Sequence, residues 1–237
     1  MDGVGLLVRD DGVIARETAR MRAAPVGLER PVVILKGWRA FDSNARVLRD
    51  RLRRLIEPGS GMIRHYNYGS TLGIARIARR VAAEVRADFP GCGEFDVIGV
   101  SMGGLLGRWI AMEGLLRVER LFTVVTPHGG AQLATFTFPL DVSTMNMRAG
   151  SALLGELDEA LEDESRRPGR IVTYTRTRDV WVGSRNTVIR GPGECVEGRV
   201  VRTPRFGLAH LRATGDPLIA VDIARRLRGE APLEVAS

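Results

Sequence analysis

Short apolar runs alternate with amphipathic segments along most of this chain. The runs predict buried strands, and they span residues 31–35, 62–68, 94–100, 121–125, 169–175 and 198–203. Between the first two runs, apolar residues recur at the spacing of a helix face, as Val47, Leu48, Leu52 and Leu55 do. Strands that alternate with helices favour a parallel sheet with crossover connections. We therefore expect an α/β fold with a mostly parallel open sheet of about six strands and helices on both faces.

Two stretches do not follow this alternation. The stretch of residues 127–168 is too long for a plain connection between two elements. Within it, the apolar and irregular part FTFPLDVSTMNM precedes the amphipathic segment SALLGELDEALEDE. We expect an inserted cap or lid here, whose apolar residues either shape a pocket for substrate or form the cap's own core. Residues 1–30 are expected to form an N-terminal extension, in which IARETARMRAA predicts a short helix packed against the sheet.

Length and composition indicate an ordinary globular protein. A chain of 237 residues, with 44% apolar and 27% charged residues, suits one domain that spans residues 1–237. The six-residue apolar run near the N-terminus is too short for a signal peptide or a membrane span, so a cytoplasmic protein is expected.

The net charge of +7 does not by itself indicate a nucleic-acid partner. The basic residues are scattered among acids, and aromatic residues make up only 5% of the chain, so there is no basic stripe with stacking side chains. Cys92 and Cys195 have neither metal-ligand spacing nor the pattern of a disulfide framework, although one bridge between them stays open. We expect no metal site, no organic cofactor and no nucleic acid; the oligomeric state is not indicated.

The sequence GVSMGG, residues 99–104, places one serine where a predicted strand becomes a predicted helix. Such a sharp turn strains its central residue, and Gly99 and Gly103 remove side chains that would collide with the adjoining strand and helix. Ser101 would then project its hydroxyl from the carboxyl edge of the sheet, and the N–H of Met102 would lie unpaired at the start of a helix. These are the requirements of an acyl-transfer nucleophile, whereas the alternative is a plain glycine-rich turn.

Several further stretches accompany this turn: PVVILKGWRAF, HYNYGS, VVTPHGGAQLA, MRAGSALLGEL, TRTRDVWVG and LAHLRATGDPLIAVDIARRL. Together with DVIGVSMGGLLGRW they resemble the lipase and esterase branch of the α/β-hydrolase family, from about Pro31 to Leu227. The resemblance implies the α/β-hydrolase fold, a nucleophile elbow at Ser101, and a catalytic triad in the chain order serine, acid, histidine.

This chain order selects among three histidines. His210 follows Ser101 in a loop before the closing helix, near residues 216–228, and is the expected base. His128 precedes every plausible acid, so a pocket-lining or structural role is favoured for it over that of the base. His65 lies in or near a strand, where a buried, hydrogen-bonded histidine is the usual case.

Asp179 is the expected acid, because it follows a predicted strand and the resemblance of TRTRDVWVG to the family's acid loop supports it. Asp141, Asp158 and Asp163 fall in the insertion, where turn and surface charges are expected. Asp216 precedes Pro217, a pattern typical of a helix N-cap.

The resemblance also implies an oxyanion hole made by the backbone N–H groups of Met102 and Trp38. The residue before Gly37 is often histidine in the family and is Lys36 in this chain. Backbone donors do not depend on that side chain, so the chemistry is expected to survive, while the choice of Trp38 depends on the loop's conformation.

We therefore expect a serine hydrolase that cleaves a small-molecule or lipid-like carboxylic ester through an acyl-serine intermediate. Three alternatives stay open. An acyltransferase or a thioesterase would use the same triad, and a binding protein would keep the fold without catalysis.

Overall fold

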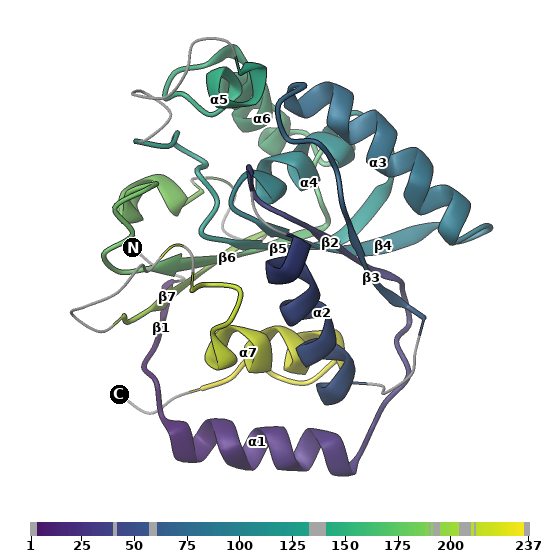
Figure 1. Ribbon diagram of the computed structural model, residues 1–237, viewed down its shortest axis with the longest axis vertical. Helices are drawn as coiled ribbons and strands as arrows, with labels where there is room; N and C mark the ends of the chain where they lie inside the picture. Colours follow the sequence, from purple (N-terminus) through teal and green to yellow (C-terminus); the bar gives the residue numbers. More distant parts are fainter. Residues whose placement is uncertain are drawn as a thin grey trace.

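One seven-stranded sheet forms the centre of the molecule (Figure 1). The computed structural model describes residues 4–39, 42–56, 61–132, 141–189, 191, 195–203, 210 and 212–234. The strand order is β1-β7-β6-β5-β4-β2-β3, and all the described strand pairs are parallel. The strands are β1 Val4–Leu7, β2 Val32–Leu35, β3 Ile63–Tyr66, β4 Glu94–Val100, β5 Arg117–Val124, β6 Arg170–Arg176 and β7 Val196–Val201.

The six strands predicted from apolar runs all form, and the seventh strand, β1, corrects the expected number. It lies in the expected N-terminal extension and pairs with β7 at one edge of the sheet. Only four residues long, β1 buries Leu7 while Leu6 is 53% exposed. A strand this short, with one buried side chain described, leaves too little alternation for the pattern to be recognised.

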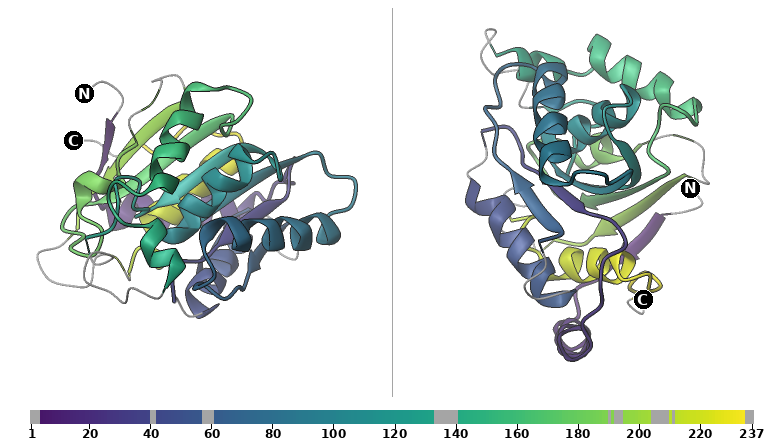
Figure 2. Two further views of the ribbon diagram at one scale, coloured as in Figure 1. Left: turned by 90° about the horizontal axis from the view of Figure 1, so that it is seen from above. Right: turned by 90° about the vertical axis from the view of Figure 1, so that its right-hand side faces the viewer.

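Helices cover both faces of the sheet (Figures 1 and 2). One face carries α3 Ile74–Asp88, α4 Met102–Met112, α5 Val142–Asn146 and α6 Ala152–Glu159; the other carries α1 Asp11–Ala23, α2 Asp42–Leu55 and α7 Pro217–Leu227. Two clusters of buried apolar side chains fill the spaces between the sheet and these layers. The expected α/β architecture is therefore present.

The amphipathic patterns place most of the expected residues in these cores. On α2, Leu48, Leu52 and Leu55 are buried, whereas Val47 is 47% exposed and does not belong to the buried face. Val47 immediately precedes Leu48, so it lies about 100° around the helix from that residue, toward solvent. Helix α7 begins at Pro217 with Asp216 as its N-cap, as predicted.

Helix α1 is a second correction to the predicted N-terminal segment. It contacts α2 and α7 and lies outside them in Figure 1, further from the sheet than either. Its buried residues Ile14 and Met21 are too few to cover a sheet face directly. Ion pairs from Arg20 to Glu230 and from Arg225 to Glu17 join α1 to the end of the chain.

The described part of the predicted insertion extends the helical layer on the α3 and α4 side. Leu153, Leu154 and Leu157 of α6 are buried in the same cluster as α3 and α4. Residues 133–140 of the insertion lie outside the described residues, so the expectation of a lid stays a prediction. Within the described ranges, no helix is both long and apolar enough to cross a bilayer.

Candidate active site

The expected site residues follow the carboxyl ends of neighbouring parallel strands. Leu35 at the end of β2 pairs with Gly99 of β4, and Val100 pairs with Val124 of β5. Arg176 at the end of β6 pairs with Val201 of β7. Because all strands run the same way, the loops after β2, β4, β6 and β7 leave from the same edge of the sheet, where ligands bind in open α/β folds.

Ser101 occupies a strained backbone conformation between β4 and α4. Its φ of 53° and ψ of −123° are rarely adopted by residues with a side chain. Its N–H donates to Val124 O at 2.8 Å, which fixes the turn to β5. A Cβ on Gly99 would meet the backbone of residues 103 and 104 under 3 Å, and one on Gly103 would meet the backbone of Leu35. The glycines are therefore required by close backbone approach, as the sequence predicts.

A continuous line of hydrogen bonds joins three residues that are distant in the sequence. His210 Nε2 lies 3.0 Å from Ser101 Oγ, and His210 Nδ1 lies 2.8 Å from Asp179 Oδ2. The Asp179 side chain is fully buried, and that of His210 is mostly buried. Geometry of this kind allows the imidazole to take a proton from the hydroxyl while the carboxylate holds its second nitrogen.

Asp179, the expected acid, is held in place by its own loop. Asp179 Oδ1 accepts hydrogen bonds from the backbone N–H groups of Trp181 at 3.0 Å and Val182 at 3.2 Å. The other carboxylate oxygen is thereby directed at His210. Arg178 before it has a φ of 67°, and Thr177 accepts a hydrogen bond from the N–H of Thr203, so this loop is joined to the segment after β7.

Trp181 is a site residue that sequence reasoning did not single out. Its ring stacks on the His210 imidazole, with ring centroids 5.5 Å apart and planes 17° from parallel. The stacking limits rotation of the imidazole about its side-chain bonds. The only sequence signal was a large aromatic residue two positions after the expected acid.

The loop after β2 lies directly against the nucleophile. A Cβ on Gly37 would lie 3.2 Å from Ser101 Cβ and 3.7 Å from Ser101 Oγ, so a side chain there would crowd the serine. Trp38 follows Gly37, and Met102 is the first residue of α4, where amide groups lack partners within the helix. Both residues expected to donate to an oxyanion therefore belong to segments beside Ser101.

His128 lies apart from this line of hydrogen bonds and is only 3% exposed. Its Nδ1 lies 3.3 Å from the Arg108 guanidinium, and its Nε2 lies 3.1 Å from Thr123 Oγ1. Burial, together with the charge of Arg108, holds the pKa of His128 well below 6.5. Of the two roles considered for His128 besides the base, these contacts favour the structural one.

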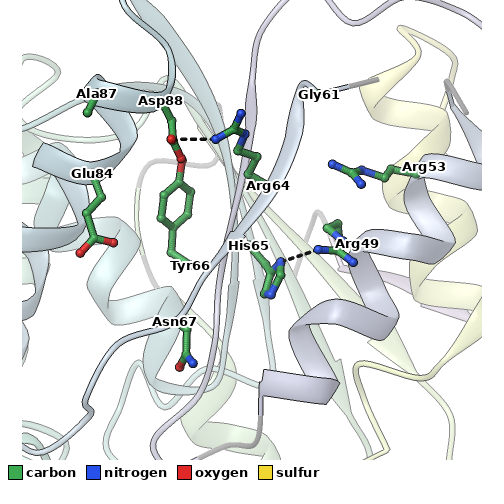
Figure 3. Close-up of a pocket in the computed structure, with 10 residues that line it drawn as sticks. All are labelled: Arg49, Arg53, Gly61, Arg64, His65, Tyr66, Asn67, Glu84, Ala87 and Asp88. Carbon is green, nitrogen blue, oxygen red and sulfur yellow. Dashed lines mark hydrogen bonds and ion pairs between the residues drawn. The ribbon is translucent and has the colours of Figure 1, made fainter. Parts of the chain in front are cut away.

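His65 lies in a separate groove of about 620 Å³ along the edge strand β3 (Figure 3). Its Nδ1 lies 3.0 Å from Arg49 of α2, so it is hydrogen-bonded as expected but only partly buried. On the α3 side of the groove, Arg64 pairs with Asp88 at 2.7 Å. Three arginines and two acids are among the residues that line this groove, and none of the expected catalytic residues lines it.

The remaining aspartates have distinct places. Asp158 bonds Arg108, Asp163 accepts from Ser165 in an exposed turn, and Asp216 caps α7. Asp141 is the exception to the expected surface role, because it is only 5% exposed and accepts a hydrogen bond from the Trp38 indole at 2.7 Å.

The described residues contain no cluster of three histidine, cysteine, aspartate or glutamate side chains that could hold a metal ion. No disulfide joins Cys92, which is exposed, to Cys195, which is buried.

No protein-family model matches the chain, and no curated protein matches it in sequence. Solved structures do. Phospholipase PlaB from Legionella pneumophila is 18% identical with a TM-score of 0.52, over 63% of this chain and 40% of PlaB. The chain thus spans about two-fifths of the length of PlaB.

Two further structures cover most of both chains. One comes from work on LipS and LipT, two metagenome-derived lipolytic enzymes; it is 14% identical with a TM-score of 0.62, over 87% of this chain and 96% of the other. The other is the NocB thioesterase domain in a covalent complex with a fluorophosphonate nocardicin G analogue, at 16% identity and a TM-score of 0.51, over 85% and 96%. All three have the α/β-hydrolase fold, and this chain has it as well, as the sequence predicted.

Proposed function

We propose that this protein is a serine hydrolase that cleaves carboxylic esters through an acyl-serine intermediate. The observation that carries the proposal is the hydrogen-bonded line from Asp179 through His210 to Ser101, on a strained turn at the carboxyl edge of the sheet. Strain is retained where surrounding contacts enforce it, and such positions cluster at active sites. The similarity of this protein in fold to lipolytic enzymes supports the same reaction class.

In the proposed reaction, Ser101 Oγ attacks the ester carbonyl carbon while His210 Nε2 takes the hydroxyl proton. The carbonyl electron pair moves to its oxygen, and the N–H groups of Met102 and Trp38 donate hydrogen bonds to the oxyanion formed. When this electron pair re-forms the carbonyl, the bond between the carbonyl carbon and the alcohol oxygen breaks, and His210 gives its proton to the departing alcohol. Water, deprotonated by His210, then attacks the acyl-serine in the same way and releases the acid.

The surroundings of the site favour an apolar acyl group. Exposed apolar side chains lie on segments that adjoin it: Leu72 before α3, Val142 and Met145 on α5, and Val180 directly after Asp179. Val142 also lies close to Gly73, so two of these segments meet. Apolar side chains left in water near a catalytic site are suited to contact a lipid-like substrate.

A thioesterase is the second candidate, and similarity in fold to the NocB thioesterase domain favours it. An acyltransferase would also use the same acyl-serine. The three activities differ in the leaving group and in the acceptor. Esters and thioesters with the same acyl chain separate the first two, and an added alcohol that captures the acyl group faster than water would identify a transferase.

The test is turnover of a panel of p-nitrophenyl esters and acyl-CoA thioesters of varied chain length by the wild type and by Ser101→Ala and His210→Ala. Either substitution should lower kcat by roughly 10⁴ or more, and the double variant should be little worse because the groups act as a unit. The wild type, but not Ser101→Ala, should be labelled by a fluorophosphonate.

His128→Ala is the matched control, because it removes a histidine that is not hydrogen-bonded to Ser101 or Asp179 in the structure. Its kcat should fall far less. Activity that survived His210→Ala but not His128→Ala would overturn the assignment of the base. A folded wild type that neither hydrolysed any substrate nor accepted the label would instead support the binding-protein alternative.

A further inference from the structure

Asp141 links the predicted insertion to the loop beside Ser101. One carboxylate oxygen, Oδ2, accepts a hydrogen bond from the Trp38 indole N–H at 2.7 Å, across 103 positions of sequence. The other, Oδ1, accepts from the backbone N–H groups of Ser143 at 3.0 Å and Thr144 at 3.4 Å, and so caps α5. A single buried carboxylate therefore holds both segments.

Helix α5 is itself fixed to the main body of the fold. Ser143 Oγ accepts a hydrogen bond from the N–H of Gly73, and Asn146 Oδ1 accepts one from the N–H of Ile74, both at 3.1 Å. These two N–H groups lie at the start of α3, where backbone donors have no partner within the helix, and α3 packs on α4. The anchor that Asp141 offers to Trp38 is consequently a rigid one.

Other described contacts hold the loop after β2 on both sides of Trp38, and on one side Lys36 O accepts a hydrogen bond from the Tyr68 hydroxyl. The N–H of Arg39 donates to Ser70 Oγ at 2.8 Å, and Arg39 has a φ of 46°, so the chain turns sharply here. The Arg39 guanidinium lies over the Trp38 ring, 4.8 Å from its centroid. Between these two points, the hydrogen bond from the Trp38 indole to Asp141 adds a constraint on the orientation of the Trp38 peptide group.

We propose that Asp141 is a positioning residue for the oxyanion hole: through the Trp38 indole it holds the loop after β2 so that the Trp38 backbone N–H points at the reacting carbonyl oxygen. The inference rests on the proposed function and adds a residue to it. An indole N–H bonded to a carboxylate is a charge-assisted hydrogen bond, stronger than a neutral one, and burial strengthens it further.

The simpler alternative is that Asp141 only caps α5. The two roles can be separated because they use different oxygens. Trp38→Phe removes the indole donor and leaves the cap in place. Thr144→Val serves as a control for disturbance at the start of α5, because it removes the hydroxyl that donates to the Asp141 backbone O at 2.7 Å and leaves both contacts of the Asp141 carboxylate in place. Asp141→Asn has one carbonyl oxygen and cannot accept at both positions.

The experiment compares kcat, KM and thermal midpoint for the wild type, Trp38→Phe, Asp141→Asn, the double variant and the Thr144→Val control, on the best ester. Trp38→Phe and Asp141→Asn should each lower kcat by about tenfold, less than the loss of a whole oxyanion donor, with KM changed by no more than about twofold. The kcat of the double variant should be no lower than that of Asp141→Asn alone, because both substitutions remove the same hydrogen bond between Trp38 and Asp141. Thr144→Val should keep kcat within about twofold.

A second measurement follows the oxyanion itself. A trifluoromethyl ketone forms a tetrahedral adduct with the serine, and its inhibition constant should rise in Trp38→Phe by about the same factor as kcat falls. A role confined to capping α5 would move the thermal midpoint of Asp141→Asn and leave Trp38→Phe unaffected in both kcat and inhibition.

The proposal is overturned if the wild type is active and Trp38→Phe keeps its kcat, or if the effects of the two substitutions multiply. Should Asp141→Asn fail to fold, Trp38→Phe and its inhibition constant decide the matter alone. A wild type that shows neither esterase activity nor Ser101-dependent labelling refutes the proposed function itself, and the positioning role with it.

Discussion

At the scale of single residues, two histidines of the same chain differ because of what surrounds them. His210 lies between a carboxylate and a hydroxyl, so its protonated form would have a counter-charge next to it. His128 lies between Arg108, which can only donate, and Thr123, so its Nδ1 must accept and its Nε2 must carry the proton. The hydrogen-bond partners of His128 are thus Arg108 and Thr123, and neither of its ring nitrogens is bonded to Ser101 in the structure.

The lowered pKa of His128 predicts a dependence of stability on pH. The folded state keeps this ring neutral, whereas the unfolded chain protonates it near its ordinary value of 6.5. Its contribution to the free energy of unfolding is therefore fully present above pH 6.5 and is lost on acidification, at about 1.4 kcal/mol per pH unit.

Denaturant unfolding at pH 7.5 and 5.5 checks this prediction by comparing the wild type with His128→Gln. The wild type should lose about 1.4 kcal/mol more than the variant on acidification, because the variant has no imidazole to protonate. Equal losses in the two proteins would contradict the assigned environment of His128.

At the scale of elements, the cap of α7 joins the end of β6 to the turn that carries His210. Asp216 Oδ1 accepts the N–H of Leu218 at 3.0 Å, and Asp216 Oδ2 lies 3.2 Å from the Arg176 guanidinium. A hydrogen bond from the N–H of Ala213 to His210 O begins the same turn. The start of this helix therefore helps to place the imidazole.

Two variants of Asp216 should separate the cap from the ion pair. Asp216→Asn keeps a capping oxygen and Asp216→Ala does not, while both lose the charge that faces Arg176. We expect Asp216→Ala to have the lower free energy of unfolding, by about 1 kcal/mol, measured by denaturant unfolding at constant pH. Identical values would show that the side-chain cap does not stabilise α7.

Much of the element order could be predicted from the sequence, for reasons that are local. A parallel strand buried on both faces leaves an apolar run such as 94–100, and a helix with one buried face leaves a period near 3.6, as in α3. The pattern failed where burial is slight. β1 buries only Leu7 among its described side chains, and α1 packs on other helices with two buried residues.

At the scale of the whole molecule, a buried polar network joins the sheet, α7 and the C-terminal segment. Asp222 of α7 accepts hydrogen bonds from Tyr174 of β6 at 2.7 Å and from Arg226 at 3.0 Å, and contacts Arg199 of β7 at 3.3 Å. It also accepts the N–H of Leu233 at 2.6 Å. The carboxylate is fully buried, and the two arginines are largely so.

Removal of this carboxylate should destabilise the fold strongly. Asp222→Ala removes one of the two carboxylates that face Arg199 and Arg226, the other being Glu197, and leaves the buried Tyr174 hydroxyl and Leu233 N–H without their acceptor. A loss on the order of 3 kcal/mol in the free energy of unfolding is expected. Denaturant unfolding measures the loss, and Asp163→Ala, in an exposed turn, should leave the midpoint unchanged. A small loss in Asp222→Ala would mean that the network is dispensable.

Some features of the candidate site could be predicted from neighbouring residues in the sequence, and others depend on contacts between distant residues. The elbow could be predicted from GVSMGG because the clash that Gly99 avoids is with the start of the following helix, whereas Gly103 avoids the backbone of Leu35 and Lys36 at the end of β2, which only the structure places there. Ser101, Asp179 and His210 could be predicted from residue type together with the chain order and acid loop that the family resemblance implies, and the structure brings them within hydrogen-bond distance. Their catalytic roles stay predictions until the variants are measured.

By itself the sequence determined the strands and helices with well-buried faces, the sharp turn at Ser101 and the order of the chemically competent residues. Only the tertiary structure decided that Trp181 stacks on His210, that Asp141 reaches Trp38, that His128 is enclosed by Arg108, and that β1 joins the far edge of the sheet. The physical reason is the separation along the sequence of the residues that come into contact. Periodicity and turn chemistry record contacts within a few residues, whereas these partners meet only after the sheet has assembled and its loops have been brought to a common edge.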